Sequence, residues 1–194
     1  MARQNFNPGA LTAPLPPVLV TCGDMEKANI ITIGWTGILN TKPPMTYISV
    51  RPSRFSYNII KEKGEFVINL PPASLVKEVD LCGIKTGGKI DKFKTCNFTM
   101  EESKEVACPT IKECPVSLEC KVKDIMELGS HHVFIADIVN VSADDGIIDK
   151  DGRLCFDKAD LMAYIHGEYF AIGKKIGKFG FSVTKKRRNT SKGK

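Results

Sequence analysis

The chain has 194 residues, of which 42% are apolar and 26% are charged, which suits one globular domain with a real hydrophobic core. No apolar run approaches the length of a membrane span, and the first residues, Met1 to Pro8, lack the apolar core of a signal peptide. These features argue against a membrane protein and predict a cytoplasmic one.

The net charge of +6 comes from one end of the chain. Residues 185–194 hold six of the 28 lysines and arginines and no acid, so 22 basic residues face 22 acidic ones elsewhere. We predict an N-terminal arm at 1–13, one domain at 14–183 and a disordered basic tail at 184–194. A nucleic-acid contact through this tail is an alternative, but no aromatic residue or motif there supports it.

The seven cysteines are an odd number and include no Cys-x-x-Cys pair. Cys108, Cys114 and Cys120 recur at intervals of six, but metal ligands usually come as tight pairs, and Cys120 falls inside a strand pattern. We therefore expect free, mostly buried thiols in a reducing compartment and no metal site.

In chain order, the apolar patterns predict short strands with turn residues between them. The first half should contain strands at 18–22, 28–34, 45–50 and 65–70 and helices at 54–63 and 73–81. Ser53 is the expected N-cap of the first helix and Gly64 its C-terminal stop. A loop at 83–93 and an irregular stretch at 98–114 should follow.

The two longest strand patterns, 117–128 and 131–142, flank Gly129-Ser130 and predict a β-hairpin. Beyond them we expect a short strand at 146–148, a brief helix at 157–162 and an extended segment at 164–172. Long helices do not alternate with the strands, which argues against a doubly wound α/β sheet. The prediction is a mainly β protein, a six-stranded antiparallel barrel with short helices.

The only tryptophan, Trp35, ends an alternating strand and sits between Gly34 and Thr36-Gly37, which are poor core fillers. Close behind it, Ser49-Val-Arg-Pro-Ser-Arg-Phe-Ser56 places two arginines and hydroxyls at the start of a helix, where backbone N–H groups favour an anion. An aromatic surface beside an anion clamp suits a planar, phosphorylated cofactor such as flavin mononucleotide (FMN). The alternatives are a core tryptophan and two solvated arginines paired with nearby acids.

Gly83-Ile-Lys-Thr-Gly-Gly-Lys89 satisfies most of a phosphate-loop signature. It fails at Ile90, where that loop needs Ser or Thr to hold magnesium, and it follows a helix instead of a strand. A nucleoside triphosphatase is therefore disfavoured, although the glycines beside Thr86 can still present N–H groups to an anion.

His131 and His132 are adjacent on a predicted strand, so they should face opposite sides and cannot share one metal ion. One of them is expected to be exposed and the other to titrate or hydrogen-bond in a site. No Ser-His-Asp order, HExxH motif or pair of glycosidase carboxylates stands out. The sequence gives no positive evidence for hydrolytic chemistry.

Several motifs in the same order resemble the flavin reductase-like proteins with an FMN-binding split barrel, and among them the flavoredoxin branch. The resemblance runs from about Pro14 to Gly180. Its carriers are Asn29, Thr32-Ile-Gly-Trp-Thr-Gly37, Pro44-Met45, Ser49-Val-Arg-Pro-Ser-Arg54, Glu65-Phe-Val-Ile-Asn-Leu-Pro71, Cys82-Gly83, Asp91-Lys-Phe93, Cys114-Pro115 and Glu127-Leu-Gly-Ser-His131.

This resemblance implies a homodimer that binds FMN non-covalently near the subunit interface. By motif match, the residues around the isoalloxazine ring would be Asn29, Trp35, Ser56, Lys92, His131 and Tyr164, with Thr36 beside them. The phosphate would fall to Arg51, Ser53 and Arg54, helped by Thr86 and Gly87. Where the family often has Ser-Gly, this chain has Thr86-Gly87, which keeps the hydroxyl.

The implied chemistry is electron transfer through the flavin. Lys92 or a protonated His131 would be the catalytic cation that stabilises negative charge on the reduced ring. One hypothesis is a reductase that takes electrons from NAD(P)H, bound transiently, and passes them to a flavin or a ferric complex. The second is an electron carrier with a protein donor and acceptor. A nucleic-acid-binding barrel that uses the basic tail is a third, from another class.

Overall fold

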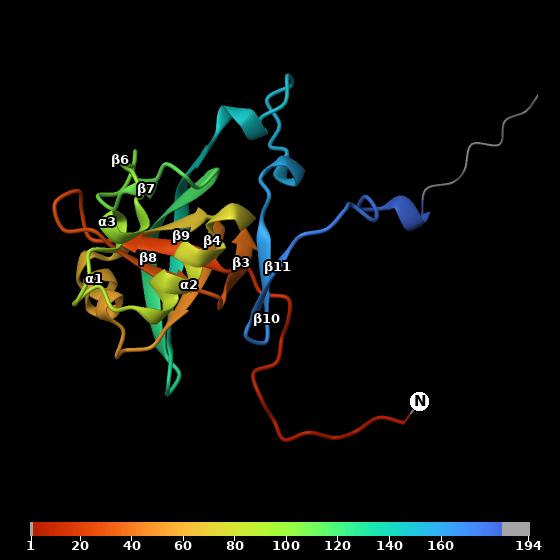
Figure 1. Cartoon of the computed structure of the whole chain (residues 1–194), viewed down its shortest axis with the longest axis horizontal. Helices are drawn as coiled ribbons and strands as arrows, with labels where there is room; N and C mark the ends of the chain where they lie inside the picture. Colours follow the sequence, from red (N-terminus) through yellow and green to blue (C-terminus); the bar gives the residue numbers. More distant parts are fainter. Residues whose placement is uncertain (1, 184–194) are drawn as a thin grey trace, which may run out of the picture.

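The computed structural model describes residues 2–183, and its centre is one seven-stranded antiparallel sheet (Figure 1). The strands lie in the order β2-β1-β5-β8-β9-β4-β3. Their bounds are β1 Val18–Cys22, β2 Asn29–Ile33, β3 Thr36–Thr41, β4 Pro44–Val50, β5 Glu65–Leu70, β8 Val116–Glu127 and β9 His132–Ala143. The predicted hairpin at Gly129-Ser130 is confirmed as the β8–β9 connection, within one residue at each strand end.

A closed barrel of six strands was the wrong prediction. The sheet has a seventh strand, β3, and its two edge strands, β2 and β3, are not paired with each other. Only Gly34 and Trp35 separate β2 from β3 in the chain, so the sheet must curl back on itself to bring its two edges together. Strand β3 was missed because its side chains are mostly exposed and carry no apolar alternation.

Two apolar cores lie on opposite faces of the sheet, and alternation along β1 supplies both. Val18 and Val20 point into the interior of the curled sheet, where they meet Phe66 and Phe134. Leu19 points to the other face, into a second cluster with residues of the helices. Strand β1 is buried on both faces and pairs with β2 and β5, so it contributes side chains to both cores.

Three α-helices pack beside the sheet, namely α1 Phe55–Lys63, α2 Val76–Ile84 and α3 Lys92–Cys96, with a 3₁₀ turn, η1 Ala73–Leu75, before α2. The predicted stop at Gly64 is confirmed, since Gly64 adopts a left-handed φ of 69° and its N–H bonds to the Ile60 carbonyl. The predicted Ser53 cap is wrong, because Arg54 occupies the N-cap position and its side chain makes no capping bond. Helix α3 was not predicted, since the loop predicted at 83–93 covers its first two residues; the Asp91 side chain caps it.

The remaining elements are short. They are the ladders β6 Met100–Glu101 with β7 Thr110–Ile111 and β10 Met162–Ile165 with β11 Glu168–Ala171, and the 3₁₀ turns η2 Asp145–Ile147, η3 Phe156–Lys158 and η4 Phe181–Val183. The strand predicted at 146–148 is therefore a 3₁₀ turn, and the helix predicted at 157–162 is only η3. The extended segment predicted at 164–172 reverses at His166 and Gly167, both with positive φ.

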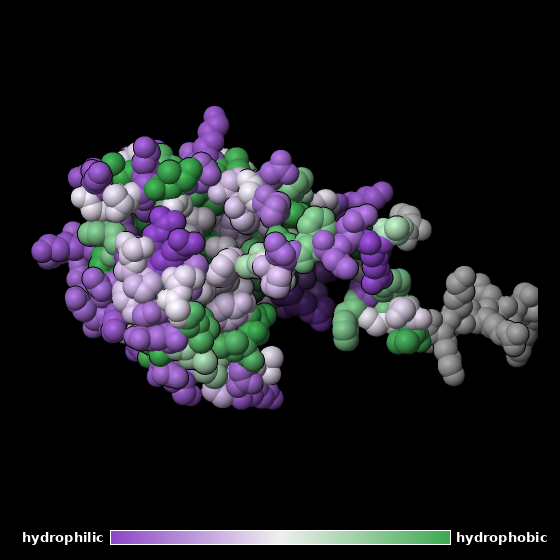
Figure 2. Space-filling model, turned by 90° about the horizontal axis from the view of Figure 1, so that it is seen from below, coloured by the Kyte–Doolittle hydropathy of each residue, from purple (hydrophilic) through white to green (hydrophobic). Residues whose placement is uncertain are grey.

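Both ends of the described chain leave the body of the protein. Residues 2–13 are exposed and form no helix or strand, and residues 172–183 run away from the sheet in Figures 1 and 2. The predicted basic tail at 184–194 lies outside the described residues. Among residues 2–183, the longest helices have nine residues, and none could span a bilayer.

Candidate functional site

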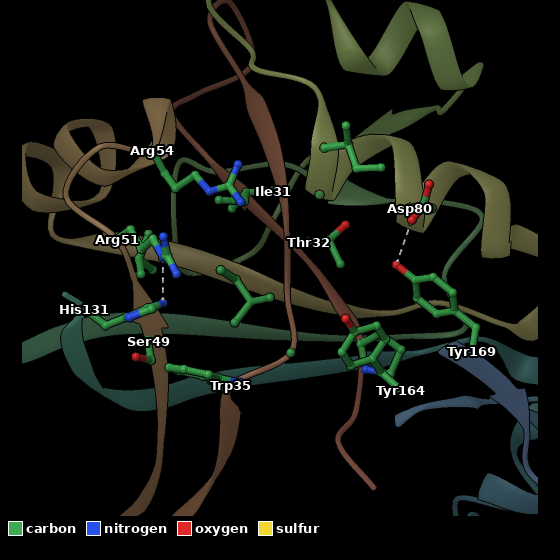
Figure 3. Close-up of a pocket in the computed structure, with 16 residues that line it drawn as sticks. Ile31, Thr32, Trp35, Ser49, Arg51, Arg54, Asp80, His131, Tyr164 and Tyr169 are labelled. Atoms are coloured by element: carbon green, nitrogen blue, oxygen red, sulfur yellow. Dashed lines mark hydrogen bonds between the residues drawn. The ribbon is translucent and has the colours of Figure 1, made fainter. Parts of the chain in front are cut away.

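A cavity of about 310 Å³ opens where β2 ends and the chain crosses to β3 (Figure 3). Its walls include the end of β2, the end of β4, the last turns of α2 and the β10–β11 hairpin, together with residues of the connections between strands. The lining residues are Pro17, Ile31, Thr32, Ile33, Gly34, Trp35, Ser49, Val50, Arg51, Arg54, Asp80, Gly83, Ile84, His131, Tyr164 and Tyr169. Of the two unpaired edge strands, β2 thus forms part of the pocket wall.

Two arginines form one end of this cavity. Arg51 follows β4 and Arg54 begins α1, and a turn in which the Arg54 N–H donates to the Arg51 carbonyl at 3.0 Å holds them together. Both side chains lie on the same side of the pocket in Figure 3. Among the ion pairs of residues 2–183, none involves either guanidinium. The alternative in which nearby acids neutralise them is therefore wrong, and two cations are available to an anion.

Trp35 and His131 form an aromatic wall next to the arginines. Their ring centroids are 4.5 Å apart, and the planes meet at 34°. The indole is 40% exposed, so Trp35 is not a core residue. The Arg51 Nε–H donates to His131 Nε2 at 3.4 Å, which ties the aromatic wall to the cationic end. As predicted, the neighbouring His132 faces the other side, where it contacts Tyr57.

A smaller cavity of about 70 Å³ continues behind Arg54, and Ile31 and Arg54 line both. It collects the predicted residues that the larger cavity lacks: Asn29, Ser53, Ser56, Thr86, Gly87 and Lys92. These residues come from β2, the α1 start, the loop after α2 and the first residue of α3. Eleven of the twelve predicted site residues therefore line one or other of two adjoining cavities.

Asn29 anchors the floor of the smaller cavity. Its side chain is buried and its Nδ2 donates to Ser56 Oγ at 2.7 Å, which links β2 to α1. Gly87 lies against the same amide, and a Cβ at this position would stand 2.0 Å from Asn29 Oδ1. A larger residue at position 87 would displace the Asn29 side chain, which explains why the Thr86-Gly87 pair needs its glycine.

Lys92 has a different setting from the one expected of a free catalytic cation. It is 4% exposed, and its Nζ donates to the Ile30 carbonyl at 2.6 Å and to the Cys82 carbonyl at 2.8 Å. These bonds join β2, α2 and α3. An ammonium group has three N–H donors, so one remains for the small cavity that Lys92 lines. Burial, and then the charge of Arg54, lower the pKa of Lys92.

Comparisons with known proteins identify the family of this chain. Residues 11–173 match the model of the flavin reductase like domain. The chain belongs to this family. A protein of Archaeoglobus fulgidus is 37% identical over 140 residues, which cover 72% of this chain and 77% of that one. The structure is similar to the flavoredoxin of Desulfovibrio vulgaris, with a TM-score of 0.87, 28% identity and coverage of 94% and 100% of the two chains. It is also similar to the flavoredoxin of Methanosarcina acetivorans, with a TM-score of 0.84, 28% identity and the same coverage.

One predicted site residue of this flavin reductase-like protein lies outside both cavities. Thr36 is the first residue of β3, and its hydroxyl donates to the Tyr47 carbonyl across the strand pair. Its side chain therefore serves the sheet, although it follows Trp35 directly. Tyr164, predicted from a short motif, does line the larger cavity.

Sequence reasoning missed Asp80 and Tyr169, which form the end of the cavity farthest from the arginines in Figure 3. Tyr169 donates its hydroxyl to Asp80 Oδ1 at 3.3 Å, which fastens the β10–β11 hairpin to α2. Burial, and then the charge of Asp80, raise the pKa of Tyr169 to about 12. A hairpin prediction for 162–171 would have found it, because Tyr169 pairs directly with Tyr164 in that register.

His131 should give the protein a measurable pH dependence. Burial, then Arg51 and Arg54, lower its pKa from about 6.5, so the neutral ring is favoured. A neutral ring that accepts at Nε2 carries its proton on Nδ1, which can donate to Ser130 Oγ, 3.0 Å away. The sequence-based role of a protonated His131 therefore finds no support in the protein without a bound anion.

Because the unfolded chain binds this proton more readily than the folded one, the His131 contribution to stability is present above pH 6.5 and is lost as the pH falls below it. We expect the free energy of unfolding to drop less between pH 7.5 and pH 5 in His131→Gln than in the wild type. Denaturant titrations of both proteins without ligand measure this difference. Parallel pH curves would contradict it.

Gly87→Ala tests the fit between the loop and Asn29. The new methyl group displaces the Asn29 amide and breaks its bond to Ser56, so we expect a loss of about 1–3 kcal/mol in the free energy of unfolding. Gly88→Ala is the matched control, because its Cβ would only meet the ring of Phe55 at 3.2 Å. Equal unfolding midpoints for the two variants in urea would refute the steric argument.

Proposed function

We propose that this chain binds FMN non-covalently and acts as a flavin-dependent electron-transfer protein of the flavin reductase type. The observation that carries the proposal is the pair of unneutralised guanidinium groups of Arg51 and Arg54 next to the half-exposed Trp35–His131 wall. The membership of the family and the similarity to two flavoredoxins support it.

The residues present fit such a group chemically. Its phosphate needs cationic and N–H donors, and the cavity end offers Arg51 and Arg54 at the start of the nine-residue helix α1. Its tricyclic ring needs an apolar and aromatic face, which Ile31 and Trp35 supply. Asn29 and the free N–H of Lys92 are polar groups held at fixed positions for the ring edge.

When bound, FMN would supply the redox chemistry by taking up and releasing electrons. The chain would bind and orient it. Arg51, aligned by His131, and Arg54 would hold the phosphate, and Lys92 would place a positive charge near the ring, where negative charge develops on reduction. His131 would help by aligning Arg51 instead of as a cation.

The electron donor and acceptor distinguish a reductase from an electron carrier. The cavity keeps Trp35 at its exposed edge, so a small donor such as NAD(P)H can reach the ring transiently, and so can a protein donor. We favour a reductase that passes electrons from NAD(P)H to a flavin, a ferric complex or a protein. The second candidate is a carrier that has no NAD(P)H activity.

An anaerobic titration separates the two candidates and tests the function. The chain is reconstituted with FMN, freed of excess by gel filtration and mixed with NADH or NADPH. Rapid bleaching of the flavin band supports the reductase, and bleaching only by a reduced ferredoxin-like protein supports the carrier. A chain that keeps no flavin after reconstitution at neutral pH contradicts the proposal as a whole.

A homodimer is part of the proposal. The two segments that leave the body carry strongly exposed apolar side chains, among them Phe6 on the N-terminal arm and Ile176, Phe179 and Phe181 near the other end. A second copy of the chain could bury these groups, which are otherwise costly to expose together. Sedimentation equilibrium of the full chain tests this point, and a monomer at micromolar concentration would refute it.

A further inference from the structure

Two cysteines behind the smaller cavity lie close enough to react with each other. Cys82 is in α2 and Cys96 ends α3, and their sulfur atoms are 3.8 Å apart in a thiol–thiol contact. Both are free cysteines. Cys82 also lines the cavity, and its carbonyl accepts one of the two hydrogen bonds from Lys92. The thiol pair is therefore built into the wall of the site.

We propose that Cys82 and Cys96 form a reversible disulfide that fastens α2 to α3 and slows the exchange of the flavin. The disulfide itself rests on the thiol geometry alone, and its effect on exchange rests on the proposed function. Closing the bond requires the sulfur atoms to approach from 3.8 Å to about 2.05 Å. Helix α3 has only five residues, and while Lys92 and Phe93 at its start are buried, Cys96 at its end is partly exposed, so its last turn is the part that can move.

The order of the chemistry follows from exposure. Cys96 is partly exposed, whereas Cys82 is buried, so Cys96 meets a small disulfide first. The Cys96 thiolate attacks one sulfur of the small disulfide and expels the other half as a thiolate. Cys82 then loses its proton and attacks the Cys96 sulfur, which expels the second half. Two protein thiols are oxidised, and one small disulfide is reduced to two thiols.

The local charges bear on the rate of this exchange. Burial raises the pKa of Cys96 and raises the pKa of Cys82 to about 12, while the nearby Lys92 ammonium acts in the opposite direction on both. The thiols therefore react slowly at neutral pH and faster at pH 8.5. Cys114 is buried in the same cluster, but the thiol–thiol contact is made by Cys82 with Cys96.

The disulfide would act on the site through the segment of chain that connects the two cysteines. Residues 83–95 include Thr86, Gly87 and Lys92, all of which line the small cavity. A disulfide would close this segment into a short loop and restrict its opening. Because the bound form of the loop is then held ready, flavin release should slow.

The first test is the formation of the bond, measured without flavin. The purified full chain is incubated with oxidised glutathione at pH 8.5, the remaining thiols are alkylated, and the protein is analysed by intact mass and peptide mapping. We expect the intact mass to fall by two hydrogen atoms, and the peptide map to contain two peptides joined by a disulfide between Cys82 and Cys96. Cys155→Ser, which removes the other partly exposed cysteine, should form the same link. Cys96→Ser should not.

Glutathione left on Cys96 as a stable mixed disulfide, or seven alkylated cysteines, would overturn the proposal. The second test compares FMN release from the oxidised and reduced protein by fluorescence recovery after dilution. We expect release to be roughly fivefold slower from the oxidised form. Equal rates would overturn the coupling to the site. A protein that forms the link but never binds FMN would instead refute the proposed function.

Discussion

Arg54→Ala is expected to weaken FMN binding about 30-fold, with a range from about 10- to 100-fold, because it removes the one guanidinium that lines both cavities. Charge-assisted hydrogen bonds to phosphate contribute about 1.5–3 kcal/mol when they are lost without replacement. Fluorescence quenching of FMN at fixed ionic strength measures the dissociation constant. The backbone bonds of Arg54 to Arg51 and Tyr57 do not need its side chain, so the helix start should persist.

Two further variants give this experiment its control. Arg54→Lys keeps the charge but loses the planar fork, so its affinity should fall between those of the wild type and Arg54→Ala. Arg153→Ala removes one positive charge from a loop that lines neither cavity, and it should bind FMN as the wild type does. If Arg54→Ala and Arg153→Ala bind equally well, the phosphate lies elsewhere.

The parts of the fold that the sequence predicted well are those with a strong local signal. In β2 and in the β8–β9 hairpin, successive side chains point to opposite faces of the sheet, which a local pattern can predict. The residues Gly129-Ser130 mark the turn of the hairpin. Gly64 was found because a left-handed C-cap favours glycine. In each case neighbouring residues carry the information, and the tertiary structure agrees with them.

The elements and contacts that were not predicted from the sequence depend on residues that are far apart in the chain. Strand β3 exists because it pairs with β4, not because its own exposed side chains form a pattern. Helix α3 is five residues long, and Lys92 at its start is fixed by carbonyls of Ile30 and Cys82. No local pattern could show that Asp80 meets Tyr169 across 89 residues. The motifs named eleven residues that line one or other cavity, but they did not predict how these residues divide between the two.

This division changes what Lys92 is expected to do. A cation whose only task is to stabilise the reduced ring could be removed with little effect on the fold. Lys92 instead donates hydrogen bonds to two buried carbonyls of different elements, and it lines the smaller cavity but not the larger one. The protein without flavin should therefore already depend on it.

Lys92→Met is expected to lower the free energy of unfolding of the FMN-free protein by about 2–4 kcal/mol. Methionine keeps the length of the side chain but leaves the Ile30 and Cys82 carbonyls buried without a donor, at about 1–3 kcal/mol each. Urea titration of the apoprotein measures the change, and Lys89→Met, at an exposed position in the loop before α3, is the control. If the Lys92→Met apoprotein is as stable as the wild type and only the reduction potential of the FMN-bound form is shifted, the structural role of Lys92 is contradicted and its role is purely catalytic.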